Sequence, residues 1–271
     1  MAETWASILL ERADGIARLT LNRPERLNVL NSAMLTEITE AMAVIARDED
    51  IRAVVLRSAS QKAFTAGADI TEMRRLDRQA ARGFSALGHL VARRIETELP
   101  PTIAALNGYV MGGGVEIASA CDFRIGSEDV VLAQPEIDIG IFPGWGGSQR
   151  LARIIGLPRA KDLILTGRKV TAREALELGL VHQIVPNGQL DSAAMELAAV
   201  LASKSRAALM AGKRTINLTQ EMPLRDGLDE EIREWATMFG TPDQQEAMSA
   251  FLEKRKPRYS RVDAAATKPP A

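Results

Sequence analysis

Two carboxylates in one stretch of the chain have neighbours that suit acid–base chemistry. Glu116 follows the glycine run Gly112–Gly114 and precedes an apolar segment, and Glu136 stands 20 residues further on, directly after Pro135. An apolar setting desolvates a carboxylate and raises its pKa toward the range useful for proton transfer. Each glutamate alone has a plainer interpretation, as a favourable helix start or as a surface turn residue. The combination indicates an acid–base site.

The glycine run predicts a helix N-terminus beside Glu116. Asn107-Gly108 signals a turn after the apolar segment Ala104–Leu106, and an apolar, helix-like run follows the glycines. A helix start presents free N–H groups and favours negative charge, including charge that develops during a reaction. The run is not a phosphate loop, because no Gly-Lys-Ser/Thr follows, and its spacing breaks the dinucleotide fingerprint. Tight packing remains the alternative interpretation of the three glycines.

Around these residues, local patterns predict both strands and helices. Ile8–Leu10 and Ile16–Leu21 read as a hairpin, and a helix over 32–46 followed by the strand Val54–Leu56 suggests a parallel crossover. Residues 71–98 have a mixed helical pattern, and Thr171–Glu174 is a capping box. Four helices are then expected, at 193–202, 207–218, 224–239 and 242–255.

Longer motifs resemble those of the enoyl-CoA hydratase/isomerase (crotonase) family. They are FTAGADITEM at 64–73, NGYVMGGGVEIASACD at 107–122, AQPEIDIGIFPGWGGSQRL at 133–151, LTGRKVTAREALELGLV at 165–181 and AFLEKRKP at 250–257. The resemblance implies an α/β fold, a crotonase-type spiral of strand-strand-helix repeats with a C-terminal helical trimerisation region. It divides the chain into a catalytic, acyl-CoA-binding core (1–190), a C-terminal helical region (191–260) and a disordered tail (261–271).

The resemblance also assigns roles to particular residues. The backbone N–H groups of Ala68 and Gly113 would form an oxyanion hole for the thioester carbonyl oxygen, while Glu116 and Glu136 would hold the reacting water. Glu116 would help to activate that water for attack at Cβ, and Glu136 would exchange the proton at Cα. Substrate or coenzyme A contacts are implied for Ala66, Asp69, Ile70, Gly144, Trp145 and Lys254.

Two of these assignments leave alternatives open. Trp145 stands where a small residue is expected, so it either narrows the acyl pocket or fills the core. Lys254 matches a lysine that reaches the coenzyme A phosphates in relatives, but a lysine near a helix C-terminus is also an ordinary partner of the helix dipole.

The pair of glutamates selects the reaction. Hydratases that the chain resembles keep both acids, whereas isomerases usually keep only the one matching Glu136. We therefore expect reversible hydration of a trans-2-enoyl-CoA to a 3-hydroxyacyl-CoA, with enoyl-CoA isomerisation as the runner-up. Coenzyme A is part of the substrate, and no other cofactor is expected. The family also implies a homotrimer or homohexamer.

Composition excludes other classes of function. Lys+Arg 34 against Asp+Glu 35 provides no basic field for nucleic acid, which argues against an RNA-binding relative. No apolar run is long enough to span a membrane, and the N-terminus does not read as a secretory signal. A single cysteine, Cys121, fits a reducing compartment, and we expect a cytoplasmic protein in which it serves packing. His89 and His182 are too far apart in sequence to suggest a metal site.

Overall fold

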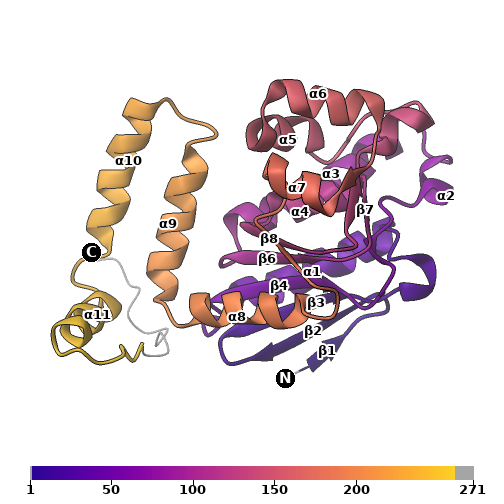
Figure 1. The fold of residues 1–271 in the computed structure, drawn as a ribbon. Coiled ribbons are helices and arrows are strands. Elements are labelled where there is room, and N and C mark those ends of the chain that lie inside the picture. Colours follow the sequence, from indigo (N-terminus) through magenta and orange to yellow (C-terminus); the bar gives the residue numbers. More distant parts are fainter. Residues whose placement is uncertain (1, 260–271) are drawn as a thin grey trace.

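Two β-sheets carry the fold, and the strands from β4 to β9 alternate between them (Figure 1). The computed structural model describes residues 2–259, so the tail predicted for 261–271 lies outside the described residues. The seven-stranded sheet has the order β1-β2-β3-β4-β6-β8-β11, and the four-stranded sheet has the order β10-β9-β7-β5. The strands are β1 (Ala2–Thr4), β2 (Ile8–Ala13), β3 (Ile16–Leu21), β4 (Ala53–Ser58), β5 (Ala63–Thr65), β6 (Thr102–Leu106), β7 (Tyr109–Met111), β8 (Phe123–Ser127), β9 (Val131–Ala133), β10 (Val170–Thr171) and β11 (Gln183–Val185).

Each turn of the chain adds one strand to each sheet and then a helix. The turns are β4-β5-α3, β6-β7-α4 and β8-β9-α5, with short helices at some of the junctions. This is the strand-strand-helix spiral that the family resemblance implies, and the expected α/β fold class is confirmed. The helices are η1 (Pro24–Arg26), α1 (Ser32–Arg47), α2 (Ile70–Met73), α3 (Arg78–Thr97), α4 (Gly113–Ala120), η2 (Pro135–Ile139), α5 (Gly147–Ile155), α6 (Leu157–Thr166), α7 (Ala172–Leu178), α8 (Leu190–Ala202), α9 (Arg206–Leu218), α10 (Leu224–Thr237) and α11 (Pro242–Leu252).

The predicted hairpin and crossover are both present. β2 and β3 pair antiparallel, and the chain reverses at Asp14 and Gly15, whose φ angles of 53° and 75° suit a tight hairpin turn. Helix α1 then connects β3 to β4, and these two strands pair in parallel. The Asn31 side chain caps α1 by accepting a hydrogen bond from the N–H of Met34 at 2.9 Å.

The continuous helix pattern over 71–98 does not form one helix. The chain makes the short α2, ends it at Met73 and starts α3 at Arg78. The side chain of Asp77 caps α3 by accepting from the N–H of Ala80 at 2.8 Å. A capping residue in mid-pattern therefore divides the segment, and periodicity alone gave no sign of the break.

Helices cover both faces of the large sheet. A large apolar cluster includes residues of α1, α3 and β4, while α8 places Ala194 and Ala198 against Val55, Ile103 and Ile125. Helix α8 thus packs on the sheet, although the sequence division at residue 190 assigns it to the C-terminal helical region.

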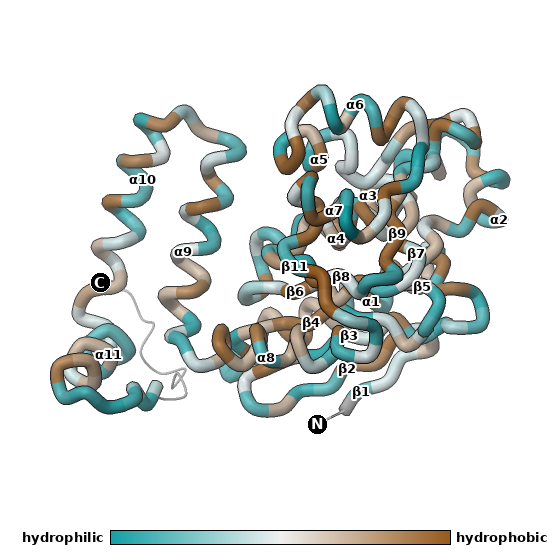
Figure 2. Tube along the Cα trace, viewed as in Figure 1, coloured by the Kyte–Doolittle hydropathy of each residue, from teal (hydrophilic) through white to brown (hydrophobic). Residues whose placement is uncertain are grey.

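Helices α9–α11 stand apart from the two sheets, and hydrophobic positions recur along them (Figures 1 and 2). The four predicted C-terminal helices are present within a few residues of their expected bounds. A buried ion pair anchors α9, since Lys213 Nζ donates to Asp122 at 2.7 Å and to the carbonyl of Ile95 at 2.6 Å. Among the described residues, no helix is long and apolar enough to cross a membrane.

Candidate active site

A close backbone contact brings the two predicted oxyanion donors together. Gly67 has φ 93°, and a Cβ on it would lie 2.9 Å from the carbonyl oxygen of Met111. Gly112 follows Met111, has a φ of 50° and immediately precedes Gly113. Only glycine tolerates both this approach and these angles. The loop that carries Ala68 therefore lies directly against the start of α4.

Neither donor N–H takes part in the bonds that hold its loop. The N–H of Leu30 donates to Gly67 O at 2.8 Å, and the N–H of Asp69 donates to Leu30 O at 2.9 Å. Because backbone groups alternate in direction along a bridge, the N–H of Ala68 points away from Leu30. Gly113 is the first residue of α4, so its N–H has no acceptor within that helix. The site thus offers two adjacent backbone donors.

Glu116 is buried in the first turn of α4, with 2% of its surface exposed. Its Oε1 accepts two backbone hydrogen bonds, from the N–H groups of Trp145 and Gly147, both at 2.7 Å. Gly147 is the first residue of α5, so the positive end of that helix faces the carboxylate. These two bonds fix the carboxylate and leave its other oxygen, Oε2, for a different partner.

Opposing effects set the proton affinity of Glu116. Burial raises the pKa of its carboxyl above the ordinary value, while the N–H groups of Gly147 and Trp145 and the positive charge of Arg150 lower it. Burial is the largest of these effects, so the net pKa is raised. Glu116 therefore holds or exchanges a proton more readily near neutral pH than an exposed glutamate does.

Glu136 lies on η2 and faces the start of α4, which carries Glu116. A Cβ on Gly112 would lie 2.9 Å from Glu136 Oε1, so this carboxylate touches the residue before Gly113. Burial, and then the negative charge of Glu116, raise the pKa of Glu136 to about 7. The charge of one acid thus acts on the other, as expected of a pair that acts on one small molecule.

Gln134 is a site residue that the sequence reasoning missed. Its side chain is buried, and in the orientation that satisfies both groups its amide nitrogen donates to Glu136 Oε1 and Oε2 at 2.9 and 3.0 Å. The amide therefore orients Glu136. Its position directly before Pro135-Glu136 was visible in the sequence, but nothing there showed its burial.

Several of the remaining predicted contact residues border the site. Ala66 precedes Ala68 in the same loop, Ile70 is the first residue of α2, and Asp69 caps α2 by accepting from the N–H of Thr71 at 2.9 Å. The carbonyl of Gly144 accepts from the Ser85 hydroxyl at 2.6 Å. Asp69 and Gly144 thus each have a structural role of their own.

Lys254 is not brought to this site within one chain. It follows α11, on the side of the molecule opposite α2 (Figure 1). Cys121 is fully buried, and burial raises the pKa of its thiol to about 12, in agreement with a packing role. The described residues contain no group of acids, histidines and cysteines arranged to hold a metal ion.

The indole of Trp145 fills the space between α3 and α4. A Cβ on Gly113 would lie 2.2 Å from Trp145 Cζ3, and a Cβ on Gly88 would lie 2.2 Å from its Cγ. Phe84, one turn before Gly88, meets the indole edge-on with ring centroids 5.3 Å apart. At both positions the absence of a side chain therefore leaves room for the indole.

Comparison with known proteins places the chain in a family. A family model described as enoyl-CoA hydratase/isomerase matches residues 11–262. The chain belongs to the enoyl-CoA hydratase/isomerase family. Among family members, the short-chain-enoyl-CoA hydratase of Clostridium acetobutylicum is 42% identical over 250 residues, which cover 92% of this chain and 96% of that protein. The crotonyl-CoA hydratase of Syntrophomonas wolfei is 38% identical over 255 residues, or 94% of this chain and 98% of that protein.

Solved structures of the family share the fold. The crystal structure of an enoyl-CoA hydratase from Bacillus anthracis has a TM-score of 0.91 and 37% identity, and the match covers 95% of this chain and all (100%) of that one. The expected membership is confirmed.

Gly88 and Trp145 should show strong coupling in stability. Alanine is favoured over glycine in a helix by about 0.5–1 kcal/mol, but here the added Cβ would collide with the indole. We expect Gly88→Ala to lower the free energy of unfolding by about 1–3 kcal/mol in the wild type and to raise it by up to about 1 kcal/mol in a Trp145→Ala background. Urea denaturation of the four proteins measures this cycle, and an equal effect in both backgrounds would contradict the packing.

Glu136→Gln should stabilise the protein at alkaline pH. The folded-state pKa of about 7 exceeds the ordinary value of 4.5, so ionising Glu136 costs folding free energy that grows as pH rises from 4.5 to 7 and then stays constant. The variant avoids this cost and should be about 1–3 kcal/mol more stable than wild type at pH 8, with little difference at pH 4. Denaturation across this range tests the sign, and a difference independent of pH would show that Glu136 titrates normally.

Proposed function

We propose that the protein is an enoyl-CoA hydratase, which adds water reversibly to a trans-2-enoyl-CoA and yields a 3-hydroxyacyl-CoA. The observation that carries this proposal is the pair of interacting, desolvated carboxylates, Glu116 and Glu136, beside two adjacent backbone donors. Relatives named short-chain-enoyl-CoA hydratase and crotonyl-CoA hydratase support the same reaction. The coenzyme A moiety belongs to the substrate, and the proposal includes no further cofactor.

In this mechanism the backbone polarises the thioester. The carbonyl oxygen accepts hydrogen bonds from the N–H groups of Ala68 and Gly113, which stabilise the negative charge that develops on it when a nucleophile attacks Cβ. A donor of this kind typically contributes about 100- to 1,000-fold to the rate. Both donors are main-chain groups on loops whose conformation depends on glycine residues, so they are already oriented before the substrate binds.

The two glutamates handle the water. Oε1 of Glu116 is held by the N–H groups of Trp145 and Gly147, so Oε2 is the oxygen that accepts the proton of the attacking water. Glu136, oriented by Gln134, exchanges the proton at Cα. The backbone amide of Gly144 helps to hold the water. Both acids are needed, because one accepts the proton of the water and the other exchanges the proton at Cα.

Amide variants of the two acids test the mechanism. Glu116→Gln and Glu136→Gln each remove proton transfer while keeping the side-chain shape, so we expect kcat to fall about 100-fold or more. Loss of the absorbance of the conjugated thioester in crotonyl-CoA reports the rate, and calorimetry with butyryl-CoA reports binding, which should persist. Glu128→Gln, at an exposed glutamate, is the matched control.

Near-normal turnover in both variants would contradict these roles. Product analysis separates the two reactions of the family, because only hydration brings an oxygen from water into the product. A wild-type protein that merely moves the double bond of a 3-enoyl-CoA would be an isomerase.

The proposal includes a homotrimer or homohexamer. Apolar side chains form one stripe along α10 at intervals of three or four residues, and they are largely exposed in the single chain, as with Leu224 (79%), Ile232 (67%) and Trp235 (65%). Further exposed apolar residues lie on α11, including Phe251 (82%). Helices α9–α11 stand apart from the core (Figure 1), so these surfaces are placed to pack against another copy.

Native mass measurement tests this assembly. Trp235→Glu puts a charge into the apolar stripe and should shift the protein to a smaller species at micromolar concentration. Thr237→Glu, on the opposite face of α10, introduces the same side chain and should leave the mass unchanged. A monomeric wild type, or equal masses for all three proteins, would contradict the proposed assembly.

The proposal also includes a role for Lys254 and a cellular location. A contribution of Lys254 to coenzyme A binding requires the site of a second copy, because Lys254 follows α11, which lies on the side of the molecule opposite α2 (Figure 1). The single, buried Cys121 suits a reducing compartment, which supports a cytoplasmic location.

A further inference from the structure

The indole of Trp145 lies next to both reacting parts of the proposed substrate. Its six-membered ring rests on Gly113, whose N–H is a proposed donor to the thioester oxygen, and its own backbone N–H bonds Glu116 at 2.7 Å. The thioester oxygen and the carbon that receives water are fixed by these same groups. The first acyl carbons beyond Cβ would therefore lie beside the indole.

The indole is held firmly in place. Only 4% of Trp145 is exposed, Gly88 and Gly113 enclose the ring system from α3 and α4, and Phe84 meets its edge. Arg150 donates to the carbonyl of Trp145 at 2.9 Å. A ring fixed on so many sides does not swing aside easily, so it limits the length of a chain that extends toward it.

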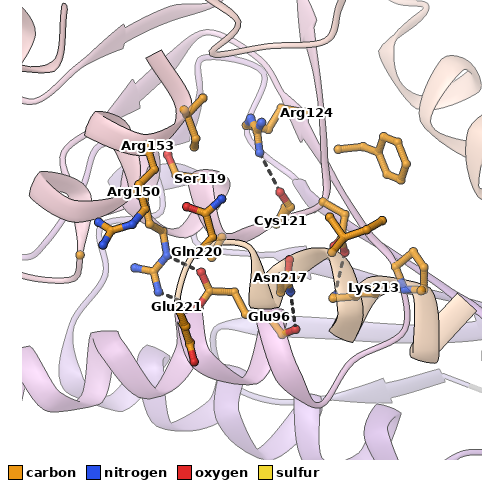
Figure 3. A pocket seen from close by; sticks show the side chains of 18 of the residues that line it. Glu96, Ser119, Cys121, Arg124, Arg150, Arg153, Lys213, Asn217, Gln220 and Glu221 are labelled. Carbon is orange, nitrogen blue, oxygen red and sulfur yellow. Dashed lines mark hydrogen bonds and ion pairs between the residues drawn. The ribbon is translucent and has the colours of Figure 1, made fainter. Parts of the chain in front are cut away.

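A cavity lies near this residue, although Trp145 itself does not line it. A cavity of about 860 Å³ separates α9 from α3, α4 and α5, and its lining includes His89 and Gly146, the chain neighbours of Gly88 and Trp145. Figure 3 shows its polar side chains, with Asn217 of α9 beside Glu96, which also pairs with Arg150. Its apolar lining includes Ile154, Leu209 and Ile216.

We propose that Trp145 determines acyl-chain length, by closing the acyl pocket on the side of this cavity and restricting the enzyme to short enoyl chains. This inference rests on the proposed hydratase function. It makes Trp145 a specificity-determining residue whose side chain selects the substrate, while its backbone N–H fixes Glu116 and is retained in any substituted variant.

The test compares chain-length profiles of folded variants. kcat/KM is measured for crotonyl-CoA, trans-2-hexenoyl-CoA, trans-2-octenoyl-CoA and trans-2-decenoyl-CoA. In the wild type we expect kcat/KM to fall roughly tenfold or more from the crotonyl to the octenoyl thioester. In Trp145→Ala the octenoyl-to-crotonyl ratio should rise by about tenfold or more, chiefly through KM for the longer substrate.

Additional variants separate specificity from loss of packing. Trp145→Leu and Trp145→Phe should give smaller shifts in the same direction, and they keep the test open if the alanine variant does not fold. Met42→Ala makes a cavity in the core beneath α1 and should lower stability without changing the chain-length ratio.

Each outcome decides a separate question. A wild type that hydrates octenoyl-CoA as well as crotonyl-CoA, or folded Trp145 variants with the wild-type ratio, would overturn the inference and leave the hydratase function standing. Absence of hydration of every thioester by the wild type would instead overturn the proposed function on which the inference rests.

Discussion

The hydrogen bonds from the start of α5 to the Glu116 carboxylate are the interaction on which the site depends. Burying an ionised carboxylate costs several kcal/mol, whereas each bond to a charged acceptor returns about 1.5–3 kcal/mol. Two such bonds offset much of the cost without removing it, so the pKa of Glu116 stays raised. The same bonds draw the loop before α5 onto α4, and they thereby fix the position of Trp145.

Close backbone approach is the second constraint, and glycine makes it possible. Gly67 brings the Ala68 loop against Met111, Gly112 lets Glu136 reach the start of α4, and Gly113 accommodates the indole of Trp145. The spiral supplies the scaffold, because β5 and β7 are adjacent parallel strands whose ends carry these two loops. Donors, acids and the indole are thus arranged by strand ends and helix starts that the fold places side by side.

Part of this arrangement follows from local sequence. Chain reversal at Asp14-Gly15, the period of α1 and the helix after the triple glycine were all predictable, since each depends on neighbouring residues. The two-sheet spiral came from the family resemblance, as the sequence itself shows no repeat. The burial of Gln134 and the need for glycine at position 88 depend on partners distant in sequence, whereas the break at Asp77 comes from a local helix cap that periodicity does not reveal. Glycine is unfavourable inside a helix, and the structural reason for Gly88 in α3 is the indole of Trp145.

The most direct test of the account is to incubate the wild-type protein with crotonyl-CoA in water enriched in oxygen-18 and to locate the label by mass spectrometry. If the paired glutamates direct water to Cβ while the backbone donors hold the thioester oxygen, the product is 3-hydroxybutyryl-CoA with one labelled oxygen in its hydroxyl group and an intact thioester. Unlabelled acyl-CoA with a displaced double bond, or a labelled free acid with released coenzyme A, would contradict the account.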